Sequence, residues 1–111
     1  MKKRIFEGCA TAIITPMHED GSVNEQAFMD LVEQQIKGGI DALVVCGTTG
    51  ESAVLTHEEH TRVIEIAIKQ AAGRVPIIAG TGSNDTAYAI QLTKHACEVG
   101  CDAMLLVTPY Y

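Results

Sequence analysis

The sequence predicts an α/β fold built on a parallel sheet, either a barrel or a doubly wound sheet, and two observations support this. Short apolar runs alternate with segments of helical periodicity along the whole chain. In addition, residues 39–45 (GIDALVV) have the same pattern as residues 100–106 (GCDAMLL), which is a helix stop, an aspartate and a small residue opening an apolar strand. Repeating βα units of roughly 30 residues favour a parallel sheet.

The first unit is predicted to contain a strand at residues 9–15 (CATAIIT), which Pro16 closes. Ser22 and Glu25 have capping-box spacing at the start of the following helix, and Asn24 is an alternative N-cap. The helical face of this unit, mostly apolar, consists of Phe28, Leu31, Val32, Gln35 and Ile36, and the helix ends at Gly38 and Gly39.

The second strand is predicted at residues 42–46 (ALVVC), and it is apolar on both faces, as is typical of a buried parallel strand. Thr56 and Glu59 form a capping box for the second helix, which Gly73 ends.

The third strand is predicted at residues 75–79, and Asn84 or Asp85 caps the helix after it. Gly100 ends that helix, and a fourth strand follows at residues 103–107.

These elements amount to about three and a half βα units, whereas a closed (β/α)8 TIM barrel typically takes about 250 residues. An uncovered last strand would leave barrel-lining side chains without partners, and each would lose up to about 1.5–3 kcal/mol. Either the sheet is open or residues 1–111 are part of a longer protein, and we therefore favour a fragment.

Composition excludes several classes of function. The formal net charge of −6 disfavours binding to nucleic acid or to an anionic membrane surface. No apolar run reaches the roughly 18 residues of a transmembrane helix, and we expect a cytoplasmic protein. The cysteines are expected to be reduced packing residues, with no metal site, and they are Cys9, Cys46, Cys97 and Cys101.

Polar residues at the carboxyl ends of the predicted strands are the candidates for a site, because sites of parallel α/β folds form there. These segments are residues 15–16 (TP), 47–51 (GTTGE), 80–84 (GTGSN) and 108–111 (TPYY). Hydroxyls next to tight-turn glycines suit a small carboxylate, because backbone N–H groups can approach it closely.

Three of these motifs, taken in order along the chain, resemble the dihydrodipicolinate synthase family of pyruvate-dependent class I aldolases. They are residues 47–52 (GTTGES), 79–82 (AGTG) and 108–111 (TPYY). The resemblance implies a lyase of lysine and diaminopimelate biosynthesis, without a cofactor, that condenses pyruvate with L-aspartate 4-semialdehyde through a lysine Schiff base. It also implies that residues 1–111 are the N-terminal portion of a single (β/α)8 TIM barrel, with the remainder of the barrel outside this sequence. The whole protein is expected to be a homo-tetramer, a dimer of tight dimers.

The resemblance assigns roles to individual residues. Thr49 would bind the pyruvate carboxylate, and Thr48 would belong to a Thr–Tyr–Tyr proton relay. Tyr111 would be the relay tyrosine that reaches into the site of a neighbouring subunit. The family's second relay tyrosine, its substrate-binding arginine and its Schiff-base lysine would lie beyond residue 111, so we expect the chain alone to be inactive. None of the lysines present falls at a strand end, and they are Lys2, Lys3, Lys37, Lys69 and Lys94.

The resemblance also implies a cleft at a dimer interface where lysine inhibits sensitive members of the family. The matching residues are Ser52, Ala53, His57, His60, Asn84 and Tyr110. A glutamate expected in this cleft to pair with the ammonium groups of lysine is Tyr88 in this sequence.

Three alternatives remain. N-acetylneuraminate lyases tend to carry serine at the position of Thr48, and keto-deoxy-sugar aldolases usually lack the Glu51-Ser52 continuation. A non-catalytic open sheet could bind a phosphate at residues 80–82 (GTG), although Asp85 breaks the dinucleotide fingerprint. His57 and His60 are three residues apart and do not form the H-E-x-x-H zinc motif.

Overall fold

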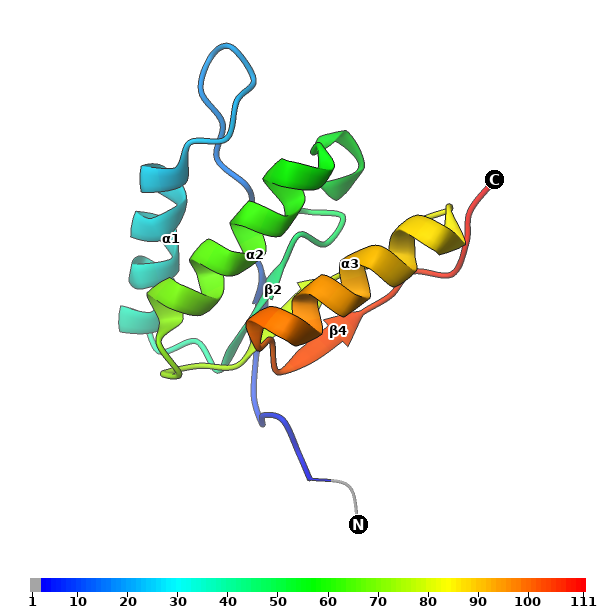
Figure 1. Cartoon of the computed structure of the whole chain (residues 1–111). Coiled ribbons are helices and arrows are strands. Elements are labelled where there is room, and N and C mark those ends of the chain that lie inside the picture. The colour runs from blue at the N-terminus through cyan, green and yellow to red at the C-terminus, as the bar shows by residue number, and fades with distance from the viewer. Residues whose placement is uncertain (1–2) are drawn as a thin grey trace.

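The computed structural model describes residues 3–111 and has a four-stranded parallel sheet with three helices on one face (Figure 1). The elements are β1 (Ala10–Ala12), α1 (Glu25–Lys37), β2 (Ala42–Val45), the 3-10 turn η1 (Ser52–Val54), α2 (His57–Ala71), β3 (Ile77–Gly80), α3 (Thr86–Val99) and β4 (Ala103–Leu105). The strands are paired in the order β1-β2-β3-β4. A doubly wound sheet would reverse this order at a switch point, so the sheet is a barrel segment.

The core lies between the sheet and the helices. Phe28 and Val32 of α1 and Val63 and Ile64 of α2 are fully buried against β2 and β3. The helical periodicity predicted for these segments is therefore confirmed, and its apolar face is the buried one. This packing leaves the carboxyl ends of the strands free to carry polar loops.

The repeated aspartate has the same structural role in both copies. The amide of Asp41 donates to the carbonyl of Cys9, and the Asp41 carboxylate accepts from the amide of Cys9 at 2.8 Å. In the same way Asp102 donates its amide to Ile77 and accepts the Ile77 amide on its carboxylate, at 2.9 Å. Each aspartate thus joins the start of its own strand to a residue at, or just before, the start of the preceding strand.

The helix caps decide between the sequence alternatives. Asn24 caps α1 by accepting from the amide of Ala27 at 3.0 Å, so the capping box predicted for Ser22 is wrong. The Ser22 hydroxyl instead donates to Asp20 within the preceding turn. At α3 the cap is Asp85, not Asn84.

The second helix begins as predicted and ends differently. Thr56 accepts from the amide of Glu59, and the Glu59 carboxylate accepts from the amide of Thr56, which confirms the capping box. The C-cap is Ala72, with a left-handed φ of 50°, and Gly73 follows it with a φ of 78°. The reversal therefore occupies two residues, whereas the sequence predicted a stop at the glycine alone.

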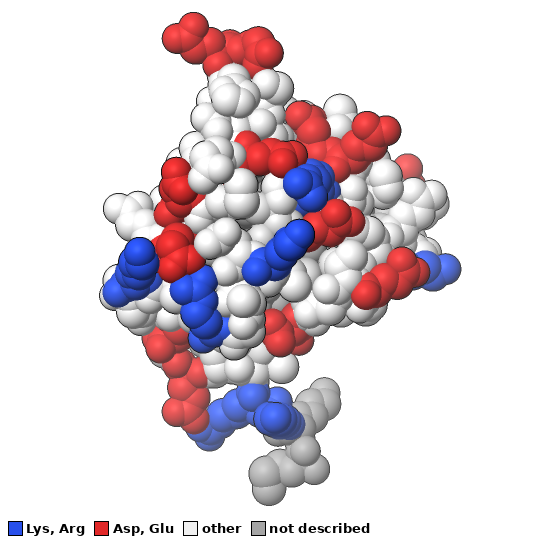
Figure 2. Space-filling view, turned by 60° about the vertical axis from the view of Figure 1, so that its left-hand side comes forward, with Lys and Arg blue, Asp and Glu red and all other residues white. Residues whose placement is uncertain are grey.

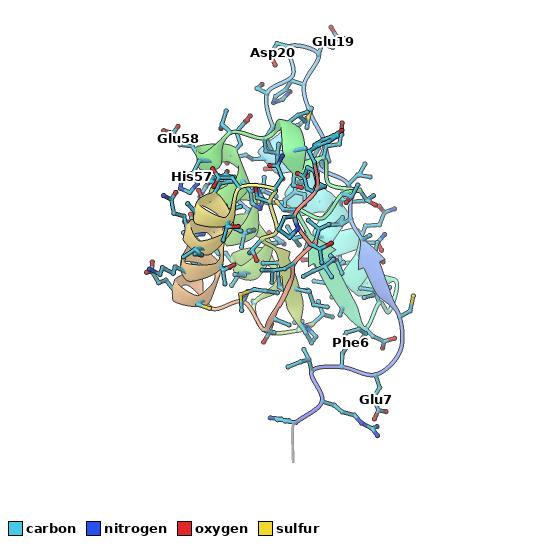
Figure 3. All side chains as sticks on the ribbon, turned by 90° about the vertical axis from the view of Figure 1, so that its right-hand side faces the viewer. Phe6, Glu7, Glu19, Asp20, His57 and Glu58 are labelled. Atoms are coloured by element: carbon cyan, nitrogen blue, oxygen red, sulfur yellow. The ribbon has the colours of Figure 1, made fainter. Side chains whose placement is uncertain are left out.

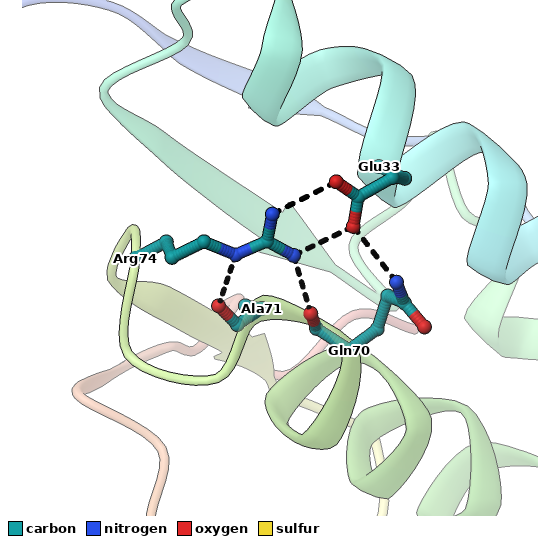
Figure 4. Close-up of polar contacts among 4 residues, drawn as sticks. All are labelled: Glu33, Gln70, Ala71 and Arg74. Atoms are coloured by element: carbon teal, nitrogen blue, oxygen red, sulfur yellow. Dashed lines mark hydrogen bonds and ion pairs between the residues drawn. The ribbon is translucent and has the colours of Figure 1, made fainter.

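An ion pair joins α1 to the turn after α2. The guanidinium of Arg74 donates to both carboxylate oxygens of Glu33, at 2.6 and 2.8 Å, and to the carbonyls of Gln70 and Ala71 (Figure 4). These hydrogen bonds from Arg74 lower the pKa of Glu33 from 4.5 to about 2. On the face that carries these helices, acidic and basic side chains are interspersed (Figure 2).

The cysteines only partly match the expectation of packing residues. All four are free, and only Cys46 is buried, where burial raises the pKa of its thiol to about 12. Cys9 and Cys97 are exposed because they lie at strand and helix ends. Within residues 3–111 no group of three or more His, Cys, Asp or Glu side chains could hold a metal ion. None of the helices in this range is long and apolar enough to cross a bilayer.

Candidate functional site

The carboxyl ends of the strands lie at the end of the molecule where α2 begins. Figure 3 shows His57 and Glu58, at the start of α2, near the same end as the Glu19–Asp20 turn and far from Phe6 and Glu7. The loops after β2, β3 and β4 meet at this end, so the segments selected from the sequence are brought together.

The loop after β2 presents Thr48 and Thr49 on two overlapping turns. The amide of Gly50 donates to the carbonyl of Gly47 at 3.1 Å, and the amide of Glu51 donates to the carbonyl of Thr48 at 2.9 Å. Both threonine side chains are exposed. Within residues 3–111 neither hydroxyl has a hydrogen-bond partner, so both can bind a ligand.

The base of this loop is fixed by His60 and Gly80. The Nε2 of His60, on α2, lies 2.7 Å from the carbonyl of Gly80, and His60 is only 2% exposed. Burial lowers the pKa of His60, and the nearby His57 and His95 lower it further, so the ring is neutral and its Nε2–H donates. The backbone carbonyl of His60 in turn accepts a weak hydrogen bond from the Cys46 thiol.

The glycines of residues 80–82 have a packing role. A side chain at Gly80 would overlap the carbonyl of Cys46, and one at Gly82 would overlap the backbone of Val107. Thr81, between them, is fully buried and shares a hydrogen bond with Thr93 of α3. Close approach of neighbouring strands therefore accounts for this motif without a bound phosphate.

A small hollow of about 50 Å³ lies at the centre of these loops. It is lined by Thr48 and Gly47 from one loop, by Gly80 and Gly82 from the next, and by Val107 beyond β4. Tyr111 stands fully exposed beyond it, with its ring against that of Tyr110 at a centroid distance of 5.7 Å. The lining thus combines the hydroxyl-bearing Thr48 and Ser52 with glycines and with the apolar side chain of Val107, whereas Thr49 lies outside it.

A second, larger cleft of about 290 Å³ separates the starts of α2 and α3. It contains five of the six residues singled out as a possible inhibitor site, which are Ser52, Ala53, His60, Asn84 and Tyr110. His57 does not line it and instead packs edge-on against Tyr88, at a ring distance of 5.6 Å. Tyr88 also lines the cleft, and burial raises the pKa of its phenol.

The lysines that the structure describes lie away from this end. Lys3, Lys37, Lys69 and Lys94 are all exposed. A Schiff-base lysine needs a dry environment that lowers its pKa, and none of these four has one.

Two residues of the site were given no role from the sequence. Thr15 is one, since its contact spans 35 positions along the chain, and the buried Thr81 is the other.

A parallel barrel segment with hydroxyl-bearing loops and tight glycine turns at the carboxyl ends of its strands is characteristic of the class of TIM-barrel proteins, whose sites form at that edge. Known proteins narrow this class. A sequence model described as the Dihydrodipicolinate synthetase family matches residues 5–111. The chain belongs to this family.

Individual relatives and solved structures belong to the same family. The 4-hydroxy-tetrahydrodipicolinate synthase of Phenylobacterium zucineum is 59% identical over 96% of the chain, which covers 36% of that relative. The dihydrodipicolinate synthase structure from Acinetobacter baumannii, complexed with pyruvate, has a TM-score of 0.93 at 52% identity, over 97% of this chain and 37% of that one. The dihydrodipicolinate synthase structure from Aquifex aeolicus has a TM-score of 0.91 at 55% identity, over 96% of this chain and 36% of that one. The chain thus spans about a third of the length of the relatives it matches.

Proposed function

We propose that these residues form the carboxylate-binding and proton-relay side of an active site that condenses pyruvate with L-aspartate 4-semialdehyde. The product would be 4-hydroxy-tetrahydrodipicolinate, in lysine and diaminopimelate biosynthesis. The shared name of the relatives and the pyruvate of the A. baumannii complex support this. In this proposal residues 1–111 are the N-terminal portion of a single (β/α)8 barrel in a cytoplasmic homo-tetramer.

The exposed Thr48–Thr49 pair, of which Thr48 lines the central hollow, carries the proposal. The amide and hydroxyl of Thr49 bind the pyruvate carboxylate. The Thr48 hydroxyl passes a proton along a relay in which Tyr111 takes part. The mainly hydroxyl character of the loops suits these roles, because hydroxyls both donate and accept hydrogen bonds.

The remaining chemistry belongs to a lysine outside these residues. Its amine condenses with the pyruvate ketone and releases water. The enamine derived from this Schiff base attacks the aldehyde carbon of aspartate semialdehyde, and the adduct cyclises. Each of these steps moves protons, so a relay beside the bound carboxylate assists them without a cofactor.

Borohydride trapping tests the proposal. The full-length protein incubated with pyruvate and borohydride should gain a covalent adduct by mass spectrometry, and residues 1–111 alone should not. A full-length protein that forms no adduct refutes an aldolase function.

Replacing the relay threonine tests its role separately. Thr48→Val should lower kcat by about 10²–10⁴-fold, the usual effect of losing a proton-transfer group. The matched control is Thr86→Val, which removes an exposed hydroxyl at the start of α3. An unchanged kcat in Thr48→Val would remove Thr48 from the relay.

A further inference from the structure

The loop that carries Thr48 and Thr49 is held from the side of β1 by a buried hydroxyl. Thr15, three residues beyond the end of β1, is 3% exposed, and its hydroxyl donates to the carbonyl of Gly50 at 2.7 Å. Gly50 is itself buried, and a side chain there would lie 3.2 Å from the Thr15 hydroxyl and from the backbone of Cys46. A buried carbonyl needs a partner inside the protein, and Thr15 is that partner.

The orientation of this one peptide determines the turn next to it. In a trans peptide the carbonyl and the following N–H point in opposite directions. With the carbonyl of Gly50 directed at Thr15, the N–H of Glu51 points the other way and donates to the carbonyl of Thr48 at 2.9 Å. Glu51 has a left-handed φ of 58°, an uncommon conformation that its surroundings must hold.

We propose that Thr15 is a positioning residue for the carboxylate-binding loop. Its hydroxyl keeps the Gly50–Glu51 peptide in the orientation that directs Thr48 and Thr49 towards the ligand. This inference rests on the function proposed above. Without the hydroxyl, the carbonyl of Gly50 must turn to find another donor, and the hydrogen bond from Glu51 to Thr48 is lost with it.

Two substitutions in the full-length protein separate the hydroxyl from the shape of the side chain. Thr15→Val keeps the shape and removes the donor, whereas Thr15→Ser keeps the donor. Thr15→Val should lower kcat/KM for pyruvate by about 10–100-fold, as expected for a small misplacement of a binding group. Its KM for aspartate semialdehyde should not change, and Thr15→Ser should restore most of kcat/KM.

The matched control is Thr11→Val. Thr11 also lies on β1, and its hydroxyl donates to Gln35 of α1 at 2.8 Å, far from the loop. Loss of stability alone would affect both variants similarly, but only Thr15→Val should raise the KM for pyruvate. If Thr15→Val does not fold, Thr15→Cys, a weak donor of similar size, should give an intermediate KM.

The outcomes are distinct. A wild-type KM for pyruvate in Thr15→Val or Thr15→Cys overturns the inference, as does an equal loss in Thr11→Val. Absence of a pyruvate adduct in the wild-type protein would instead overturn the proposed function itself.

Discussion

His60 joins three elements through one ring and one carbonyl. It lies on α2, and its ring donates a hydrogen bond to the carbonyl of Gly80, the last residue of β3. Its backbone carbonyl accepts a hydrogen bond from the thiol of Cys46, which follows β2. Because its pKa is lowered by burial, the folded state resists protonation of the ring. The hydrogen bond to Gly80 can form in either protonation state, so the cost of burying a charge is what opposes protonation of His60.

A pH dependence of stability follows from His60. The unfolded chain takes up a proton at the ordinary histidine pKa of about 6.5, and the folded chain does so only at lower pH. The free energy of unfolding should thus fall as the pH drops below about 6.5. Urea unfolding between pH 7.5 and 5.5 measures this. His60→Gln keeps a donor for Gly80 and should flatten the slope, whereas the control His18→Gln, at an exposed position, should not.

Tyr88 allows a prediction about inhibition. The cleft between α2 and α3 offers hydroxyl and amide groups but no carboxylate among its lining residues. We therefore expect millimolar lysine to leave the activity of the full-length protein unchanged. Tyr88→Glu should lower the inhibitory concentration of lysine roughly tenfold or more, because a charge-assisted hydrogen bond contributes about 1.5–3 kcal/mol.

The matched control is Ile90→Glu, which adds a carboxylate to an exposed position of the same helix outside the cleft. Inhibition of the wild-type protein by lysine would contradict the prediction, and so would equal inhibition of both variants.

At the scale of single residues, the sequence predicted where Thr48 and Thr49 lie but not what holds them. Thr48 and Thr49 follow an apolar strand between glycines, and this local pattern places them at the carboxyl end of the sheet. The hydrogen bond from Thr15 to Gly50 joins two strands, and no local pattern predicts it. The choice of Asn24 over Ser22 likewise depends on the turn that engages Ser22 with Asp20.

Among the elements, α2 has the best-defined start. Its capping box satisfies the amides of both Thr56 and Glu59. Thr56→Ala should lower the free energy of unfolding by about 1 kcal/mol, as is typical for the loss of an N-cap side chain. Thr86→Ala, which changes a threonine at the first position of α3 and not its cap, should stay within about 0.5 kcal/mol of wild type. Chemical denaturation measures both, and equal losses would refute the role of the cap.

Helices and strands were predicted with different accuracy. The helices agree to within about two residues, because their periodicity and glycine stops indicate nearly the same bounds, although the caps of α1 and α3 had alternatives. The strands are shorter than their apolar runs, as β4 shows by ending at Leu105 while the predicted strand extends to residue 107. An apolar run marks burial, whereas a strand ends where its ladder of hydrogen bonds ends, and that depends on the neighbouring strand.

At the scale of the whole molecule, the alternation of elements left the strand order open, and the barrel was expected from the family resemblance. A barrel and a doubly wound sheet share the same alternation of elements. The sequential order of the strands and the single helical layer decide for the barrel (Figure 1). Exposed apolar side chains remain at and just beyond β4, at Leu105, Leu106 and Val107.

Shared active sites are a prediction at this scale. If Tyr111 completes the site of a neighbouring subunit, each site takes Thr48 from one subunit and Tyr111 from the other. Thr48→Val and Tyr111→Phe then remove residues that different subunits contribute to the same site. Subunits of these two inactive variants, unfolded and reassembled together, should recover roughly a quarter of wild-type activity. Half of the randomly formed dimers pair the two variants, and in each of these mixed dimers one of the two sites has both intact residues. Steady-state assays before and after mixing measure this. No recovery would place Tyr111 in the site of its own subunit.

The aspartates at positions 41 and 102 have a consequence for synthesis on the ribosome. Each supplies the partner for the amide that opens the strand before it. The start of β1 therefore stays incomplete until residue 41 has left the exit tunnel, and the start of β3 waits in the same way for residue 102. The first and third units are thus each completed by a residue translated about 25 to 32 positions later, so these parts of the sheet mature behind the growing chain.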